Sequence, residues 1–269
     1  MTTSYPIILA HGFCPFDRVI NPFFRKDNPA DDSFHYFRNI RSALISNGFE
    51  AHHSRVSWGA DLKRRSIDLK NEVTRITDHF TKWPRVHIIA HSMGGLDARW
   101  MVYRHRMEDR IASLTTIGTP HLGTSYADRG LKRFGGLIPV ARHLGLNLQG
   151  LKDLTRGACT QLNRITRDFE ENNGVLYQTI AGAQPVKLIF APLRSSYRII
   201  RQEEGENDGL VSLTSAMWKE NYFLERIDAD HFNQIGWWDG GAAMAAMDRE
   251  TFEERIRAVY LNIARGLTD

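Results

Sequence analysis

Short apolar runs alternate along this chain with longer segments whose apolar residues recur every three or four positions. The short runs have the length of strands, and they occupy residues 5–10, 50–56, 86–90, 111–117, 175–181 and 222–227. Helical spacing follows most of them, at residues 34–46, 62–83, 95–106 and 252–266. Strands that are regularly followed by helices pair in parallel through crossover connections. The pattern therefore predicts an α/β fold with a mostly parallel sheet and helices on both faces.

The domain organisation follows from the length and from where the alternation stops. A chain of 269 residues can bury a large core without disulfides. We expect one domain over 1–269, because no linker or internal repeat divides the chain. Regular alternation ends after the strand at 111–117, so residues 123–158 are interpreted as an inserted helical cap. No apolar run approaches the ~20 residues that span a bilayer, so no transmembrane segment is expected.

Charge and cysteine content narrow the function classes only slightly. The net charge is +4, its basic residues are scattered, and no nucleic-acid motif is present, so nucleic-acid binding is not expected. Cys14 and Cys159 are too few for a disulfide framework, and the sequence leaves open whether they are bonded. The first residues show no signal peptide, but a trimmed chain would look the same, so the compartment stays open.

The first candidate for chemistry is the segment 90–95, Ala-His-Ser-Met-Gly-Gly, which joins a predicted strand to a predicted helix. A sharp turn of this kind lifts a serine above the sheet edge, where a substrate can reach it. Strand and helix pass close together there, and Ala90, Gly94 and Gly95 are small enough to allow it. Ser92 is therefore the predicted nucleophile, a hydroxyl that needs a base to accept its proton. The alternative, a chance serine at a glycine-rich helix start, is weakened by this position.

The loop after the first strand reads His11-Gly12-Phe13. In a hydrolase of this architecture, that loop supplies one backbone N–H to an oxyanion hole, and the residue after the nucleophile supplies another. Phe13 and Met93 are the predicted donors. A plain β-turn at Gly12 is the alternative when this motif is taken alone.

The base and the acid are expected after the nucleophile, in the order serine, acid, histidine. His231 follows the last predicted strand, whereas the other downstream histidines lie earlier in the chain, at His105, His121 and His143. Asp208 precedes a glycine and an apolar pair, in a loop that we expect at the end of a strand. Its rivals are Glu206 and Asp230, but Asp230 adjoins His231, and neighbours on an extended chain point apart. The residues predict a Ser-His-Asp triad that cleaves esters through an acyl-enzyme.

Five strings of the sequence together resemble the bacterial triacylglycerol lipases and their fungal relatives. They lie in the family's order and occupy residues 6–13, 90–95, 116–124, 207–211 and 230–231. The resemblance implies an α/β-hydrolase fold, hydrolysis of acylglycerols or similar esters, and a mobile cap over the site. Carried over residue by residue, it agrees with Ser92, Asp208 and His231 and with the backbone donors of Phe13 and Met93.

The same resemblance raises the question of a metal. Many bacterial lipases of this family hold a structural calcium beside the catalytic histidine, with an aspartate two residues after it. Asn233 occupies that position here and offers only an uncharged oxygen. No second acidic ligand is evident before Asp208, so calcium is not expected, and no other cofactor is predicted.

The predicted cap has an unusual charge pattern. Five basic residues and no acidic one fall between 129 and 152, namely Arg129, Lys132, Arg133, Arg142 and Lys152. Apolar residues recur near helical spacing in the same segment, which favours a cap with an apolar face over the acyl pocket and a basic rim toward anionic lipid surfaces. A fixed helical layer with a solvated basic face explains the pattern equally well.

The expected substrate is an ester of a fatty acid. The same triad could transfer the acyl group to an alcohol or thiol, or cleave thioesters or polyesters, because only the pocket decides between them. A catalytically silent fold used for binding is the third interpretation. Such a protein would be expected to lack the serine, the acid or the histidine, and all three are present.

Overall fold

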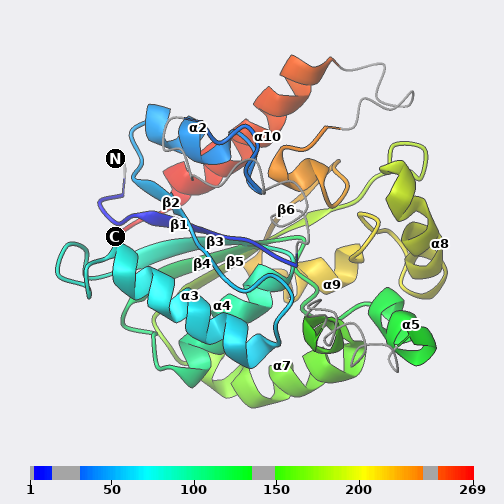
Figure 1. Cartoon of the computed structure of the whole chain (residues 1–269), viewed down its shortest axis with the longest axis horizontal. Helices are drawn as coiled ribbons and strands as arrows, with labels where there is room; N and C mark the ends of the chain where they lie inside the picture. The colour runs from blue at the N-terminus through cyan, green and yellow to red at the C-terminus, as the bar shows by residue number, and fades with distance from the viewer. Residues whose placement is uncertain (1–2, 14–30, 135–148, 239–247) are drawn as a thin grey trace.

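The structure is a computed structural model that describes residues 3–13, 31–134, 149–238 and 248–269 (Figure 1). Six strands form one sheet in the order β2-β1-β3-β4-β5-β6, and every neighbouring pair is parallel. The strands are β1 (Ile7–Ala10), β2 (Ala51–His53), β3 (Val86–His91), β4 (Ile111–Ile117), β5 (Leu176–Gly182) and β6 (Phe223–Ile227). The predicted α/β fold with a parallel sheet is confirmed.

Helices cover both faces of the sheet. On one face lie α2 (Ile40–Ser46) and α10 (Arg249–Gly266), and on the other lie α3 (Leu62–Ile76), α4 (Met93–Arg104) and α7 (Arg156–Glu171) (Figure 1). The remaining helical segments are α5 (Ser125–Phe134), η2 (Gln149–Leu154), η3 (Ala191–Leu193), α8 (Arg194–Glu203), α9 (Leu213–Met217), η4 (Glu220–Tyr222) and η5 (Asn233–Ile235). None of the helices in these described ranges is both long and apolar enough to cross a membrane.

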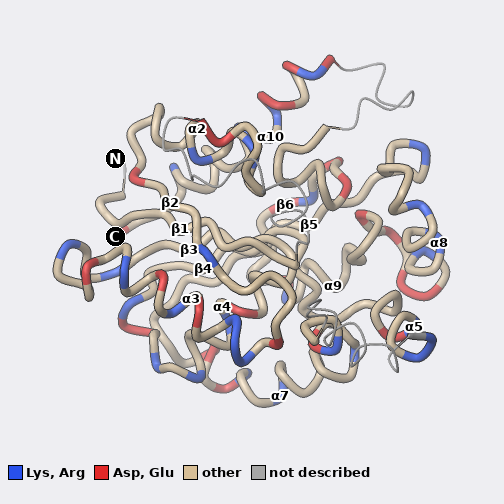
Figure 2. Tube along the Cα trace, in the orientation of Figure 1, with Lys and Arg blue, Asp and Glu red and all other residues tan. Residues whose placement is uncertain are grey.

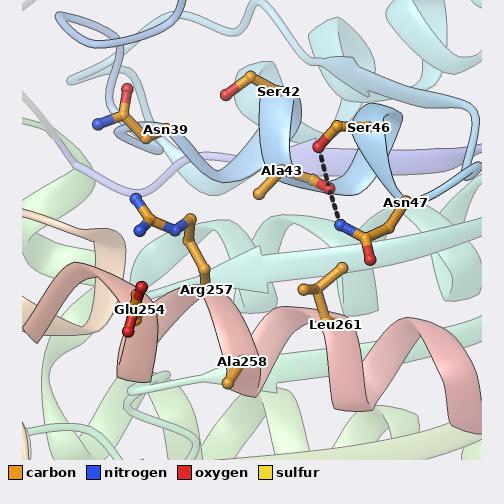
Figure 3. Close-up of a pocket in the computed structure, with 9 residues that line it drawn as sticks. All are labelled: Asn39, Ser42, Ala43, Ser46, Asn47, Glu254, Arg257, Ala258 and Leu261. Carbon is orange, nitrogen blue, oxygen red and sulfur yellow. Dashed lines mark hydrogen bonds between the residues drawn. The ribbon is translucent and has the colours of Figure 1, made fainter. Parts of the chain in front are cut away.

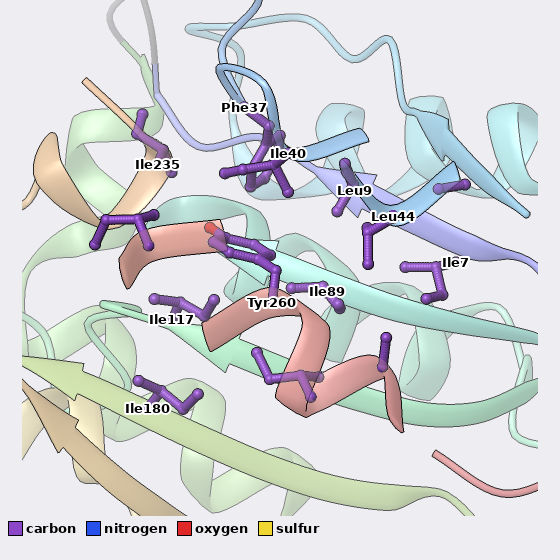
Figure 4. Close-up of a cluster of buried hydrophobic side chains, with 14 of the residues drawn as sticks. Ile7, Leu9, Phe37, Ile40, Leu44, Ile89, Ile117, Ile180, Ile235 and Tyr260 are labelled. Carbon is purple, nitrogen blue, oxygen red and sulfur yellow. The ribbon is translucent and has the colours of Figure 1, made fainter. Parts of the chain in front are cut away.

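The core forms two layers because successive strand side chains point to opposite faces. Ile7 and Leu9 of β1 belong to the cluster under α2 and α10, which Figure 4 shows, while Ile8 and Ala10 belong to the cluster under α3 and α4. Burial on both faces explains the continuous apolar runs in the sequence. β1 to β5 contain no Lys, Arg, Asp or Glu, and these charges gather on the surrounding helices and loops (Figure 2).

Two predicted helices have different bounds in the structure. The helix predicted over 62–83 ends at Ile76, because Thr77 caps it and donates its hydroxyl to the Val73 carbonyl, and residues 78–80 then take positive φ. The helix predicted from residue 34 begins only at Ile40. The carboxylate of Asp32 does accept the backbone N–H of Ser42 in the first turn of α2, but it reaches that turn across an irregular segment.

A shallow groove runs along the surface between α2 and α10 (Figure 3). Its lining is formed by Asn39, Ser42, Ala43, Ser46, Asn47, Glu254, Arg257, Ala258 and Leu261. Ser46 Oγ and Asn47 Nδ2 both donate to the Ala43 carbonyl oxygen. The groove shares no residue with the site predicted from the sequence.

Candidate active site

Ser92 lies in the turn between β3 and α4, with φ 54° and ψ −132°. A residue with a side chain pays about 1–3 kcal/mol to hold such a left-handed conformation, so the surrounding structure must enforce it. A Cβ on Gly94 would lie 2.6 Å from the Ala10 carbonyl oxygen, and one on Gly95 would lie 2.2 Å from Thr119 Oγ1. The start of α4 therefore passes so close to the end of β1 and to Thr119 after β4 that small residues are required after the serine.

The structure brings the three residues predicted for the triad into one hydrogen-bonded chain. Ser92 Oγ lies 2.9 Å from His231 Nε2, and His231 Nδ1 lies 2.7 Å from Asp208 Oδ2. A carboxylate can only accept, so Nδ1–H donates to Asp208 and leaves Nε2 of the neutral ring to accept the serine proton. All three residues are buried, with 8% of Ser92, 4% of His231 and none of Asp208 exposed. This is the geometry in which an imidazole can deprotonate a hydroxyl.

The Asp208 carboxylate is held on a tight turn. Its Oδ1 accepts the backbone N–H groups of Leu210 and Val211, at 2.9 and 2.7 Å. The rival Glu206 is half-exposed and forms a surface ion pair. The other rival, Asp230, directs its carboxylate to three backbone N–H groups and not to the imidazole.

The expectation that the acid directly follows a strand was wrong. β5 ends at Gly182, and η3 and α8 intervene before the turn at 206–212 that carries Asp208. That turn is nevertheless tied to the histidine, because the backbone N–H of His231 donates to the Asp208 carbonyl at 2.9 Å. The acid is positioned by this connection and by its own turn rather than by the end of a strand.

The predicted oxyanion donors lie on two sides of the serine. Met93 is the first residue of α4 and is fully buried, and Phe13 lies in the loop after β1, with its ring edge against Trp58. A Cβ on Gly12 would lie only 2.7 Å from Ser92 Cβ. The loop therefore passes directly beside the nucleophile, where a backbone donor is useful.

Sequence reasoning missed the ion pair that anchors this loop. Arg65 and Asp97 are both fully buried, with Arg65 Nε 2.8 Å from Asp97 Oδ2, and Arg65 also donates to the His11 carbonyl at 3.1 Å. The signal was present, since Arg65 falls on the apolar stripe of α3 together with Leu69 and Val73. A lone cation on a buried stripe needs a buried acceptor.

A second histidine lies beside the triad. The rings of His91 and His231 are 4.5 Å apart, and His91 Nδ1 lies 2.7 Å from the Tyr36 hydroxyl. Burial, and then the neighbouring His231, lower the pKa of His91 well below its usual range. His91 is therefore neutral and places no second positive charge next to the imidazolium that forms during catalysis.

Sequence reasoning also missed Gln234. Its Nε2 donates to Asp208 Oδ2 at 2.7 Å, which is the oxygen that also accepts from His231. His231 and Gln234 are three residues apart, so one turn of backbone presents both side chains to the acid. This three-residue spacing from His231 was the feature of the sequence that could have indicated Gln234.

Asn233, the position that the resemblance associates with calcium, is engaged by protein groups, and so is the nearby Asp230. Asn233 Oδ1 accepts from Gln184 Nε2, and Asn233 Nδ2 donates to the Trp237 carbonyl. Asp230 accepts three backbone N–H groups, and burial raises its pKa to about 6. Across the described ranges, no group of three or more His, Cys, Asp or Glu side chains could hold a metal. The absence of calcium stays a prediction.

A family model described as the alpha/beta hydrolase fold matches residues 5–179. The chain belongs to this family. The matched segment of the hydrolase contains Phe13, Ser92 and Met93, whereas Asp208 and His231 lie beyond it.

Several curated proteins are similar to this hydrolase over most of its length. It is 26% identical to "Triacylglycerol lipase 2" of Saccharomyces cerevisiae, over 86% of this chain and 80% of the relative. It is 27% identical to a "Triacylglycerol lipase" of Vibrio cholerae, over 84% and 79%. A "Lipase" of Staphylococcus epidermidis is 26% identical over 87% of this chain, which spans 47% of that relative's length.

Solved structures show the same fold at lower identity. Staphylococcus hyicus lipase superposes with a TM-score of 0.68 at 17% identity, covering 97% of this chain and 95% of the other. Bacillus licheniformis lipase in its mature form superposes with a TM-score of 0.64 at 20% identity, covering 94% of this chain and 91% of the other. At these identities the likeness concerns the hydrolase fold alone.

Proposed function

We propose that this protein is a carboxylic ester hydrolase that cleaves esters of fatty acids, as a triacylglycerol lipase or a related carboxylesterase. The observation that carries the proposal is the hydrogen-bonded chain from Ser92 through His231 to Asp208. The names of the yeast and Vibrio relatives support the substrate class.

The geometry supports a two-step reaction. His231 Nε2 takes the proton of Ser92 as its oxygen attacks the ester carbonyl, and then gives that proton to the leaving alcohol. Water then attacks the acyl group on Ser92, and His231 takes a proton from the water and returns it to the serine. The Asp208 carboxylate stabilises the imidazolium.

The backbone N–H groups of Phe13 and Met93 are proposed to hold the oxyanion of each tetrahedral intermediate. Each such donor lowers the barrier by about 3 kcal/mol. The tight packing of Gly12 against Ser92 supports this role, because it places the loop within reach of the reacting carbon.

The proposed cap over 123–158 includes α5 and η2, while its residues 135–148 lie outside the described ranges. A Cβ on Gly150 of η2 would lie 3.0 Å from the Met93 side chain, so this part of the cap packs on the site itself. Leu122, just before the cap, and Tyr126 of α5 are exposed, which supports contact with a lipid surface. The predicted basic rim is partly neutralised, because Arg129 forms an ion pair with Glu203 of α8. Glu203 lies outside the cap, so a count of charges within the cap does not include it.

The test combines covalent labelling with turnover. A fluorophosphonate probe should label wild type and not Ser92→Ala, while Ser46→Ala, which removes an exposed hydroxyl of α2, should label like wild type. Rates on p-nitrophenyl esters from acetate to palmitate then report the substrate class, and a steep decline beyond butyrate favours an esterase over a lipase. No labelling of wild type, or equal labelling of Ser92→Ala, would refute the proposal.

A further inference from the structure

The carboxylate of Asp208 is buried without a permanent positive partner. Within the described ranges, its only ion-pair partner is His231, and it is fully inaccessible to solvent. Its charge must therefore be stabilised by hydrogen-bond donors. Oδ1 accepts two backbone N–H groups, and Oδ2 accepts from His231 and from Gln234 Nε2, both at 2.7 Å. Among the described residues, Gln234 is thus the one side-chain donor to Asp208 besides the catalytic imidazole.

The amide of Gln234 is held between the ends of two central strands. A Cβ on Gly118, just after β4, would lie 2.2 Å from Gln234 Oε1, and a Cβ on Gly182, the last residue of β5, would lie 2.2 Å from Nε2. The backbone carbonyl of Gln234 also accepts a hydrogen bond from the Tyr260 hydroxyl of α10, at 2.9 Å. The two glycines leave space for the amide of Gln234, because a side chain at either position would overlap it.

We propose that Gln234 is a positioning residue for the reaction proposed above, on which this inference rests. Its N–H keeps Asp208 Oδ2 aimed at His231 Nδ1 and shares the negative charge of that oxygen. Without it, the carboxylate keeps its two anchors on Oδ1, but Oδ2 can turn away from the imidazole. As Oδ2 turns away, a protonated imidazole loses part of the negative charge that stabilises it, so His231 releases its proton at lower pH but is less well oriented as a base.

Gln234→Met tests this role, because methionine keeps the length of the side chain and removes the donor. We expect kcat on p-nitrophenyl butyrate to fall about tenfold to hundredfold, which is the loss of activity seen when a hydrogen bond that orients a metal ligand is removed. KM should stay within about twofold of wild type. The acid limb of the kcat/KM profile should move to lower pH, because the imidazolium of His231 is less stabilised. A residue that only packed the core would not move that limb.

Gln234→Glu is the conservative variant, and it separates the role from a folding defect. A protonated glutamic acid can donate to Asp208 Oδ2, whereas an ionised one repels it, so kcat should fall as pH rises and create an alkaline limb absent from wild type. Activity should recover when the pH is lowered again. The matched control is Gln178→Met, on β5 four residues before Gly182, about 13 Å along the strand. Gln178 accepts from Thr115 and should behave like wild type.

Each result decides the inference. If both Gln234 variants keep the wild-type kcat and pH profile while wild type is labelled by fluorophosphonate, Gln234 has no positioning role and only this inference is wrong. If Gln234→Met does not fold, Gln234→Glu decides, and the absence of a new alkaline limb overturns the inference. If wild type is neither labelled nor active, the proposed function itself fails.

Discussion

Gly94 is the position at which one added methyl group should most directly disturb the elbow. In Gly94→Ala the new Cβ would lie 2.6 Å from the Ala10 carbonyl oxygen and 2.7 Å from that of His11. Carbon and oxygen ordinarily approach to about 3.3 Å, so the methyl must retreat by about 0.7 Å from the first oxygen and about 0.6 Å from the second. Both neighbours are backbone atoms at the end of β1, and neither can rotate aside. The elbow and the oxyanion loop must therefore separate.

This separation should affect stability and rate together. Overpacking of this size costs about 1–3 kcal/mol of unfolding free energy. A misplacement of 1 Å can cost about a hundredfold in rate, so a shift of about 0.6–0.7 Å should lower kcat/KM about tenfold to thirtyfold. Ser92 itself remains, so fluorophosphonate labelling should continue at a reduced rate.

The assay is kcat/KM on p-nitrophenyl butyrate, together with urea unfolding of the same preparation. Gly174→Ala is the matched control, because a Cβ there meets nothing within 4 Å and the backbone is not left-handed. Gly174→Ala should keep the wild-type kcat/KM. If Gly94→Ala has the wild-type kcat/KM and unfolding free energy, the close approach of strand and helix is not what holds the elbow.

Three further predictions concern buried groups. Arg65→Met leaves Asp97 as an unpaired buried carboxylate and should lower the free energy of unfolding by about 3–5 kcal/mol in urea titrations. Adding Asp97→Asn should restore part of that free energy. A loss below about 1 kcal/mol in Arg65→Met would contradict the prediction. Burial lowers the pKa of His87 from 6.5 to about 4. The contribution of the neutral ring to the free energy of unfolding is therefore complete above pH 6.5 and is lost as the pH falls toward 4. The loss should be about 2–3 kcal/mol, and unfolding curves of His87→Gln should lack that slope. Burial raises the pKa of the Cys159 thiol to about 12, so in Cys14→Ser, Ellman's reagent should react only after denaturation.

The parts of the fold and site that sequence could predict are those encoded locally. Strand-turn-helix order identified Ser92, and the order of elements along the chain identified His231, because both depend on neighbouring residues and on chain direction. Asp208 was found from its glycine turn, although the element expected before it was wrong. The helix end at Ile76 was missed because the apolar spacing continues into the turn that Thr77 starts.

The parts that sequence did not predict depend on contacts between distant segments. The partner of Arg65 lies 32 residues away in α4, and no local pattern names it. In the sequence, Gln234 is an ordinary polar residue. Its special position is evident only in the structure, where Gly118 and Gly182 leave space for its amide. Periodicity reports which face of an element is buried, but it does not report which buried polar groups meet.

The glycines of the site share one cause, which is the convergence of parallel strands at their carboxyl ends. Gly12 follows β1, Gly94 follows the serine after β3, Gly118 follows β4 and Gly182 ends β5. At each of these positions a Cβ would strike a group of the site, either the backbone or side chain beside Ser92 or the amide of Gln234. Strands held in one hydrogen-bonded sheet fix such distances better than surface loops do. The spacing of the strands, transmitted through residues without side chains, therefore sets where Ser92 and the amide of Gln234 lie.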